Sequence, residues 1–376
     1  MDLLINFVLL LVGFVFLIKG ADIFVDGASD TARKFRVPKM LIGLTIVSFG
    51  TSAPELAVSI QSILSGKGDI LLGNVIGSNV LNILLILGLS ALVGTLRVNV
   101  ATVRKEIPVL VLMTLAFTIV LSDKIFGLGE NLFTRQDGVI LILFFCVFIY
   151  YLFGMANRKN VAGKEEKTEL KEKVTEKKVA ELKNIGSKDD DSKNYDSEND
   201  NSKNDYSKDI DSKDDEARDG DDEPVNLMKA LLMVIFGLVG IVFGSDLVVK
   251  SASEIATVFG VSQRIISLTI VALGTSLPEL VTSVIATKKG EYDIAIGNIV
   301  GSNIFNIGVV AGIPVAILGG VGGSAFSYVD ILALVISPIV LFFFARRGRR
   351  IGFKKGIVFL LMFVAYYSYV IMGSFA

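Results

Sequence analysis

The chain has 376 residues, 52% of them hydrophobic, and its mean hydropathy of +0.63 is too high for a single soluble domain with a polar surface. It contains no His and a single Cys, Cys146, which excludes His-based catalysis, an internal disulfide and a thiolate zinc cluster. The formal net charge of −1 averages two unlike regions, because residues 157–225 hold 15 Lys and Arg against 22 Asp and Glu. Two apolar blocks therefore flank one acidic segment.

The apolar blocks predict ten membrane-spanning helices, since a helix needs about 20 apolar residues to cross the hydrocarbon core. The predicted helices are 3–32, 38–64, 69–95, 106–122 and 137–156, followed by 226–256, 263–287, 292–318, 326–345 and 353–374. The fold class is therefore an all-α polytopic membrane protein. We divide it into a five-helix repeat (1–156), a charged and largely disordered linker (157–225), and a second five-helix repeat (226–376).

The second repeat matches the first at a constant offset of 224 residues. Aligning 38–83 with 262–307 needs no gap and gives 22 identities in 46 positions. GTSAPEL at 50–56 matches GTSLPEL at 274–280, and GNVIGSN at 73–79 matches GNIVGSN at 297–303. Shared hydrophobicity does not reproduce polar positions such as these, so the halves are interpreted as one duplicated unit.

Basic residues predict the orientation. The loops after the first, third, seventh and ninth helices carry 15 Lys and Arg, whereas the opposite loops carry four. Both termini are therefore predicted to lie outside the cell membrane and the linker 157–225 in the cytoplasm. With five helices in each half, the second half enters the membrane inverted, which is typical of secondary transporters.

Two acidic side chains, Glu55 and Glu279, lie near the middle of matching apolar runs. A carboxylate there is costly unless a cation or a partner compensates it, and neither motif contains Lys or Arg. Pro54 and Pro278 interrupt the helices and loosen the carbonyls around 48–51 and 272–275, which can then face a cation. The alternatives are a protonated Glu and a plain proline kink, and both are weakened by the symmetric repetition.

Hydroxyl and amide groups surround these carboxylates in the sequence. Asn74, Ser78 and Asn82 are spaced by four and form a polar stripe, which Asn298, Ser302 and Asn306 repeat. The alternative role for either stripe is polar contact between helices, while Asn79 and Asn303 point off the stripes and are interpreted as packing residues. Two carboxylates with neutral oxygens and no nitrogen or sulfur ligand favour calcium or sodium, bound at the midplane between the halves.

On these two blocks the chain resembles the cation/calcium exchanger superfamily, most of all the prokaryotic sodium/calcium exchangers, which are antiporters. The resemblance covers everything except the linker and implies four central ion sites, with broken helices at the centre and long, mobile helices 1 and 6. It implies that calcium binds Glu55 and Glu279 with main-chain oxygens of Thr51 and Thr275. It implies that sodium uses the same Glu pair with further oxygens: the hydroxyls of Ser52, Ser78, Ser276 and Ser302 and the carbonyls of Ser48 and Ala272. Asn82 and Asn306 would line the middle.

We therefore predict a sodium/calcium antiporter working by alternating access, a transporter and not an enzyme. It is expected to need no cofactor, nucleic acid or obligate protein partner, and to act on calcium and sodium ions within the lipid bilayer. The resemblance implies three sodium ions per calcium, hence electrogenic exchange. Some relatives carry Asp where this chain has Asn306, so potassium independence is predicted as well.

Three alternatives remain. A calcium/proton exchanger of the same superfamily usually carries Gly-Asn-x-x-Glu in place of Gly-Thr-Ser-x-Pro-Glu, and a cation channel fits an internal inverted repeat less well than alternating access does. An intramembrane aspartyl protease would need paired Asp. Outside the central blocks, Asp22, Asp26 and Asp30 are interpreted as solvated charges at a helix end, and the acidic linker as a solvated tether.

Overall fold

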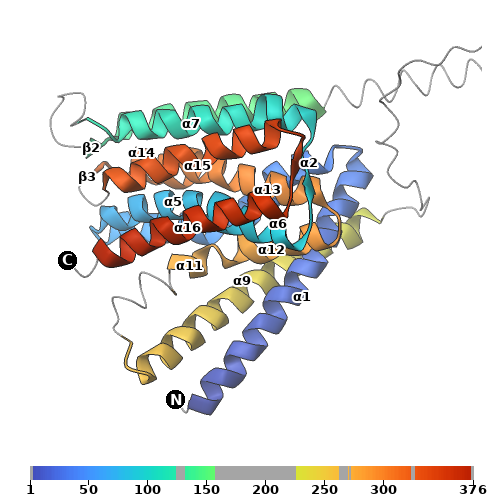
Figure 1. The fold of residues 1–376 in the computed structure, drawn as a ribbon, viewed down its shortest axis with the longest axis horizontal. Helices are drawn as coiled ribbons and strands as arrows, with labels where there is room; N and C mark the ends of the chain where they lie inside the picture. Colours follow the sequence, from blue (N-terminus) through green and yellow to red (C-terminus); the bar gives the residue numbers. More distant parts are fainter. Residues whose placement is uncertain are drawn as a thin grey trace, which may run out of the picture. The chain divides into compact units, whose positions relative to one another are not determined.

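The computed structural model describes residues 3–123, 132–156, 226–261, 270, 272–322 and 327–373. This part of the chain is helical apart from four two-residue strands (Figure 1). The linker 157–225, including its predicted disorder, lies outside the described residues, as does most of the first third of the predicted helix 263–287.

The first half contains α1 (Leu3–Phe35), α2 (Lys39–Ile42), η1 (Gly43–Val47), α3 (Ser48–Thr51), α4 (Ala53–Leu64), α5 (Gly68–Leu81), η2 (Asn82–Ile86), α6 (Leu87–Val93), β1 (Leu96–Arg97), η3 (Thr102–Glu106), α7 (Ile107–Val120), β2 (Leu132–Phe133) and the helix Arg135–Ala156. The elements labelled η are π-helical turns. They continue the neighbouring α-helices, so that 39–51, 68–93 and 100–120 are each helical without interruption.

The second half contains α9 (Leu227–Val258), α11 (Ala272–Thr275), α12 (Leu277–Lys288), α13 (Tyr292–Phe305), η5 (Asn306–Ala311), α14 (Gly312–Leu318), β3 (Val321–Gly322), α15 (Tyr328–Arg346), β4 (Arg350–Ile351) and α16 (Phe353–Gly373). In the described part of the whole chain, seven helices are long and apolar enough to span a membrane. The pair Lys39–Thr51 and Ala53–Leu64 makes an eighth if it is one span, and it bends by 45°.

The two helices that carry the Gly-Asn motif form the centre of the molecule. In the apolar window of Tyr292–Leu318, 89% of the residues are buried, and in that of Gly68–Val93 72% are. The corresponding shares are only 17% for Arg135–Ala156 and 11% for Phe353–Met372, which lie at the periphery. These outer helices expose large apolar side chains such as Tyr150 and Leu361, as expected for surfaces that face lipid.

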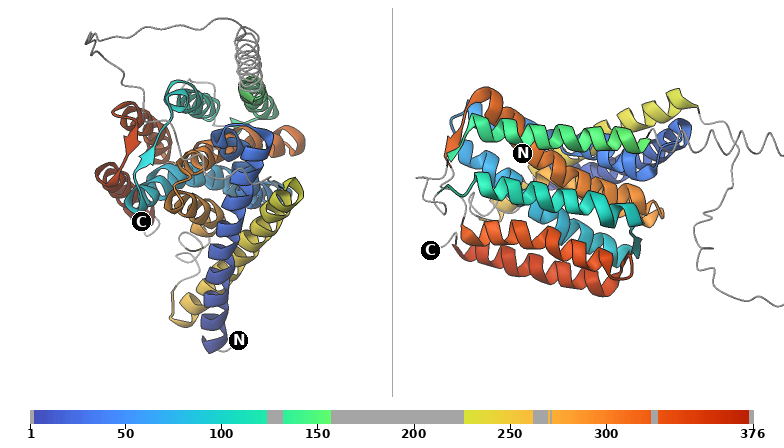
Figure 2. Two further views of the ribbon diagram at one scale, coloured as in Figure 1. Left: turned by 90° about the vertical axis from the view of Figure 1, so that its right-hand side faces the viewer. Right: turned by 90° about the horizontal axis from the view of Figure 1, so that it is seen from above.

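α1 and α9 lie side by side and run obliquely to the other helices (Figures 1 and 2). Glycines spaced by seven line their contact, and a Cβ built on Gly13 would lie 3.0 Å from the carbonyl oxygen of Gly244. A Cβ on Gly20 would lie 2.9 Å from the carbonyl oxygen of Gly237. The offset of 224 converts the first of these contacts into the second, so the antiparallel pair is self-complementary. Such small residues let two membrane helices approach backbone to backbone.

Two short antiparallel ladders join the halves. β1 pairs with β4, with Leu96 opposite Ile351, and β2 pairs with β3, with Phe133 opposite Val321. Each ladder links the segment after a central helix of one half to the segment before the last helix of the other half. Like the contact between α1 and α9, the two ladders are equivalent contacts in which the halves exchange roles.

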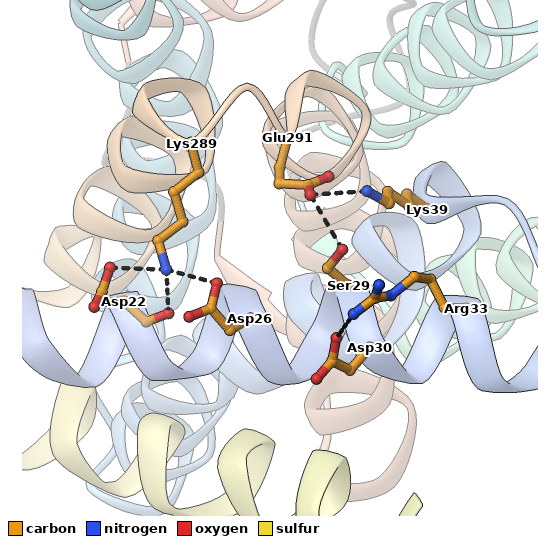
Figure 3. Close-up of polar contacts among 8 residues, drawn as sticks. All are labelled: Asp22, Asp26, Ser29, Asp30, Arg33, Lys39, Lys289 and Glu291. Atoms are coloured by element: carbon orange, nitrogen blue, oxygen red, sulfur yellow. Dashed lines mark hydrogen bonds and ion pairs between the residues drawn. The ribbon is translucent and has the colours of Figure 1, made fainter. Parts of the chain in front are cut away.

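A polar network fastens the second half of α1 to the turn between α12 and α13 (Figure 3). Lys289 Nζ lies 2.8 Å from Asp22 Oδ1 and 2.7 Å from Asp26 Oδ1. Glu291 Oε1 accepts hydrogen bonds from Ser29 Oγ at 3.1 Å and from Lys39 Nζ at 2.8 Å. Asp30 also pairs with Arg33, so the interpretation of the three α1 aspartates as solvated charges was incomplete: they are partly exposed, and each forms an ion pair.

We expect Lys289→Met to loosen this end of α1 by about 1 kcal/mol, because partly exposed ion pairs contribute roughly 0.2–1 kcal/mol each. Partial burial lowers the pKa of Lys289, but hydrogen bonds and charges from Asp22 and Asp26 outweigh it and leave the pKa raised. The contribution should thus hold at neutral pH and fade only as the pH rises through that raised pKa. Protease protection of 22–35 is the measurement, and Lys250→Met, which removes an ion pair within α9, is the control. Equal protection in the two variants would contradict the role of the network.

Candidate functional site

Two helix breaks with the same geometry create the centre of the site. Ser52 has φ −87° and ψ 7°, and Ser276 has φ −90° and ψ 4°. Proline occupies the first turn after each break and supplies no N–H, which prevents the helix from closing its regular bonds. The breaks start new helices, α4 and α12, whose first turns carry Glu55 and Glu279. Each carboxylate therefore lies at the positive end of a helix dipole.

The main-chain oxygens near the first break are only partly released. Ser52 N donates to Ser48 O at 3.0 Å, and Leu56 N donates to Ser52 O at 3.2 Å. The Ser48 carbonyl, expected among the ion ligands, thus already accepts one backbone hydrogen bond, and the Thr51 hydroxyl oxygen lies 3.4 Å from the same carbonyl oxygen. In the second half Leu280 N donates to Ser276 O at 3.0 Å, which reproduces the Leu56 bond at the offset of 224.

Both carboxylates are buried, with 1% of each residue exposed. Ser52 Oγ donates to Glu279 Oε1 at 2.8 Å, across the two halves. Within the described residues, Glu279 Oε2 and both carboxylate oxygens of Glu55 have no hydrogen-bond partner. Glu279 and Ser276 lie close to the Glu55 carboxylate. Three unpaired oxygens on two neighbouring buried carboxylates are an arrangement that only a cation or a proton can make favourable.

Asn74 and Asn298 hold the broken helices in place. Asn298 Nδ2 contacts Glu279 O at 3.4 Å and Ser283 Oγ at 2.9 Å, and Asn74 Nδ2 makes the equivalent contacts to Glu55 O and Ser59 Oγ. Thr51 Oγ1 lies 3.1 Å from Asn298 Oδ1, so this amide also spans the two halves. The sequence analysis placed both asparagines in the repeated polar stripes but not among the ion ligands, and it missed Ser59 and Ser283. The identity of these two serines at the offset of 224 is the signal in the sequence that could have found them.

Four further asparagines lie at the centre. Asn82 and Asn306 each begin a π-helical turn, a feature that is frequent at functional sites. Asn82 Nδ2 lies 3.5 Å from Asn303 Oδ1, while Asn82 Oδ1 has no partner among the described residues. The interpretation of Asn303 as a packing residue was therefore incomplete. Asn79 and Asn306 are buried with both amide atoms unpartnered in that same part of the chain.

The remaining predicted ligands lie at or beside these breaks. Ser276 Oγ lies 3.4 Å from Ser78 Oγ, and the hydroxyl of Ser302 has no partner among the described residues. Ser48 packs against Gly301, where an added Cβ would lie 2.7 Å from the serine hydroxyl. Thr275 and Ala272 lie in α11, directly before the second break, and the side chain of Ala272 is outside the described set. The structure thus brings the candidate residues of both repeats to two facing breaks.

Neutral oxygen atoms dominate the site. The described residues contain no group of three or more His, Cys, Asp and Glu side chains that could hold a metal ion. Any cation bound here therefore shares two carboxylates and completes its shell with hydroxyl, amide and carbonyl oxygens. Such a donor set suits hard cations such as calcium and sodium, and it suits zinc or copper poorly.

Asn298→Ala is expected to destabilise the protein by about 1–3 kcal/mol, because it leaves the Ser283 hydroxyl and the Glu279 carbonyl without a buried donor. It should also weaken the binding of any cation that depends on the position of Glu279. Thermal unfolding of the purified protein measures the first effect. Gln136→Ala, at an exposed position on the helix Arg135–Ala156, is the control, and equal stability of the two variants would refute the structural role of Asn298.

The chain is similar to known exchangers over nearly its whole length. The family model for the sodium/calcium exchanger protein matches residues 5–154 and 229–372. Sodium/calcium exchanger MaX1 of Methanosarcina acetivorans is 31% identical over 363 residues, covering 96% of this chain and 97% of the relative. Inner membrane protein YrbG of Escherichia coli is 31% identical over 351 residues, covering 93% and 92%.

The fold is also similar to that of a solved exchanger structure. The structure of the sodium-calcium exchanger NCX_Mj, soaked with zero Na+ and Ca2+, is 27% identical, with a TM-score of 0.72 over 98% of this chain and 100% of the other. The match extends over nearly the whole of both chains. The chain belongs to the sodium/calcium exchanger family and is a membrane antiporter, not an enzyme.

Proposed function

We propose that the protein exchanges sodium for calcium across the cell membrane by alternating access. The observation that carries this proposal is the pair of buried carboxylates, Glu55 and Glu279, with three oxygens that lack a partner among the described residues. The surrounding neutral oxygens support it, because they match the ligand preference of both ions. The name of the relative MaX1, a sodium/calcium exchanger, supports the same choice of ions.

The proposed architecture is ten spanning helices in two inverted repeats, 1–156 and 226–376, joined by the linker 157–225. Beyond the seven or eight spans that meet the length criterion, the helical stretch 100–120 and the α11–α12 segment are the two further candidates. Three features that recur at the offset of 224 support the inversion: the glycine contacts of α1 with α9, the helix breaks at Ser52 and Ser276, and the π-helical turns at Asn82 and Asn306. The excess of basic residues in alternate loops supports outside termini and a cytoplasmic linker.

In this proposal calcium binds between Glu55 and Glu279, with main-chain oxygens of Thr51 and Thr275. Sodium ions use the same carboxylates with the remaining oxygens: the hydroxyls of Ser52, Ser78, Ser276 and Ser302 and the carbonyls of Ser48 and Ala272. Asn82 and Asn306 line the space between the sites. The serine–carboxylate contact between Ser52 and Glu279 supports the assignment, because such a hydroxyl can turn its hydrogen away and offer its oxygen to a cation.

The proposed stoichiometry, three sodium ions per calcium ion, comes from the family resemblance, and it sets the charge that each cycle moves. One calcium ion neutralises the two carboxylates, whereas three sodium ions would leave the site one unit more positive. Each turnover then moves one net charge, and a membrane potential biases exchange by roughly 2.3 kcal/mol per 100 mV. Asn306 offers an oxygen without a charge, so we propose that potassium is neither required nor carried. Calcium and sodium are transported substrates here, and no cofactor, nucleic acid or obligate protein partner enters the proposal.

Calcium uptake into proteoliposomes, with sodium, proton and potassium gradients imposed one at a time, tests this function. We expect uptake with an outward sodium gradient alone, faster when the membrane potential attracts positive charge toward the sodium-receiving side, and unchanged when choline replaces potassium. Uptake driven only by a proton gradient would instead identify a calcium/proton exchanger. Uptake that persists without any counter-ion gradient and passes far more than one ion per conformational cycle would identify a channel.

A further inference from the structure

A pocket away from the central site lies where α7 begins and α15 ends. It encloses about 770 Å³ and combines three arginines, Arg104, Arg346 and Arg349, with an apolar wall that includes Val103, Pro108 and Phe342. All three arginines are exposed. None of them takes part in an ion pair within the described residues. The pocket thus offers positive charge and apolar surface side by side, without an acidic partner in the described part of the chain.

The arginine-bearing turn after α15 is held in a fixed shape. Lys355 Nζ donates to the carbonyl oxygens of Phe344 at 2.6 Å, Arg347 at 2.7 Å and Arg350 at 2.6 Å. Val98 N donates to Arg349 O at 2.9 Å, and Arg349 itself adopts a left-handed φ of 51°. Lys355 and Val98 therefore supply hydrogen bonds to the carbonyl oxygens of this turn. The guanidinium groups of Arg346 and Arg349 are not used in holding it and can bind a ligand.

Further positive charge lies on the neighbouring β1–β4 ladder. Arg97 stands directly opposite Arg350 in the β1–β4 ladder, beside the pocket. Like charges at opposed strand positions destabilise a ladder, and these two arginines add positive charge to the chain segment that also carries Arg349. The other ladder lacks this charge, because Leu132 lies opposite Gly322 and Phe133 opposite Val321. The opposed arginines are therefore confined to the β1–β4 ladder, in loops predicted to be cytoplasmic.

We propose that this pocket binds an acidic phospholipid, with the phosphate on Arg104, Arg346 and Arg349 and an acyl chain along Val103, Pro108 and Phe342. Guanidinium groups recognise phosphate oxygens in a bidentate manner, and basic pockets between spanning helices suit anionic headgroups. Arg346 is the last residue of the apolar helix Tyr328–Arg346, so the pocket lies at the membrane boundary, where lipid is always present. The acidic linker 157–225 is another source of negative charge in this chain, but its polar sequence offers little to the apolar wall.

Native mass spectrometry of the purified full-length protein tests the proposal, with phosphatidylglycerol and phosphatidylcholine of the same acyl chains as probes. We expect the wild type to retain phosphatidylglycerol preferentially and the triple variant Arg104→Gln, Arg346→Gln, Arg349→Gln to lose this preference by roughly 100-fold, from the attraction of three arginines to acidic lipid. The matched control is Lys19→Gln, Lys67→Gln, Arg135→Gln, three exposed cations elsewhere, which should keep the preference.

Three results would overturn the proposal. The first is an equal loss of preference in both triple variants, which would show an effect of overall charge. The second is displacement of phosphatidylglycerol by inorganic phosphate at a concentration that leaves phosphatidylcholine bound, which would show a phosphate site and not a lipid site. The third is displacement by a peptide of residues 187–216, which would make the linker the occupant. If the triple variant does not fold, Arg349→Gln alone should still reduce the preference, and an unchanged preference in that variant would equally refute the site.

Discussion

Replacing Glu55 or Glu279 with Gln is expected to abolish sodium-driven calcium uptake while the protein remains folded. Gln keeps the shape of the side chain, and at position 279 it can still accept the hydrogen bond from Ser52, but either substitution removes half of the negative charge of the site. Breaking a buried charge pair costs about 3–5 kcal/mol, which corresponds to a loss of roughly 100-fold to several thousand-fold in affinity for a divalent ion. Calcium uptake into proteoliposomes is the measurement.

A second readout separates a lost ligand from a misfolded protein. Both oxygens of Glu55 are unpartnered among the described residues, so Glu55→Gln should raise the thermal stability of the ion-free protein while removing its stabilisation by calcium. Glu254→Gln, at an exposed position on α9, is the control and should change neither property. Near-normal uptake in both Gln variants would show that the central carboxylates are not the ion ligands.

Gly244→Leu is expected to have the largest effect on stability. A Cβ at this position would lie 2.5 Å from the backbone nitrogen of Leu17 and 2.7 Å from the carbonyl oxygen of Gly13. Because both contacts are to backbone, no side-chain rotation can relieve them, and α1 must separate from α9. Overpacking of a close contact costs about 1–3 kcal/mol or more, and a branched side chain on a backbone contact belongs at the upper end of that range.

The matched control for this variant is Gly154→Leu. Gly154 lies on the helix Arg135–Ala156, and an added Cβ would meet nothing within 4 Å. Heating the purified variants and measuring the fraction that remains unaggregated by gel filtration should show a lowered midpoint for Gly244→Leu alone. The same midpoint temperature for both variants would mean that the close glycine contacts do not hold α1 against α9.

The main features of the fold are predictable because they depend on hydrophobicity and duplication. Long apolar runs predict the spanning helices, and the offset of 224 places Glu55 and Glu279 in equivalent environments, each in the first turn after a helix break. The bend at Ser52 follows from Pro54, whose missing N–H weakens the helix. The family was also predicted correctly from the same two blocks.

Contacts between distant segments could not be predicted in this way. Lys289 is 267 residues from Asp22 in the chain, and periodicity along α1 shows only that Asp22 and Asp26 share a face. Asn303 was assigned to packing from its angle on an ideal helix, which does not reveal that Asn82 of the other half approaches it. The hydrogen bond from Ser52 N to the Ser48 carbonyl is kept at the break. Whether it survives depends on how far the helix opens, which Pro54 alone does not determine.

Equilibrium binding of radioactive calcium to the purified protein tests the central claim most directly, because it needs neither a gradient nor a membrane. We predict one high-affinity calcium per chain, displaced by sodium with a cooperative dependence on sodium concentration, unaffected by potassium, and absent when Glu55→Gln and Glu279→Gln are combined. Calcium binding that survives the double variant, or that sodium cannot displace, would contradict a shared site between these two carboxylates.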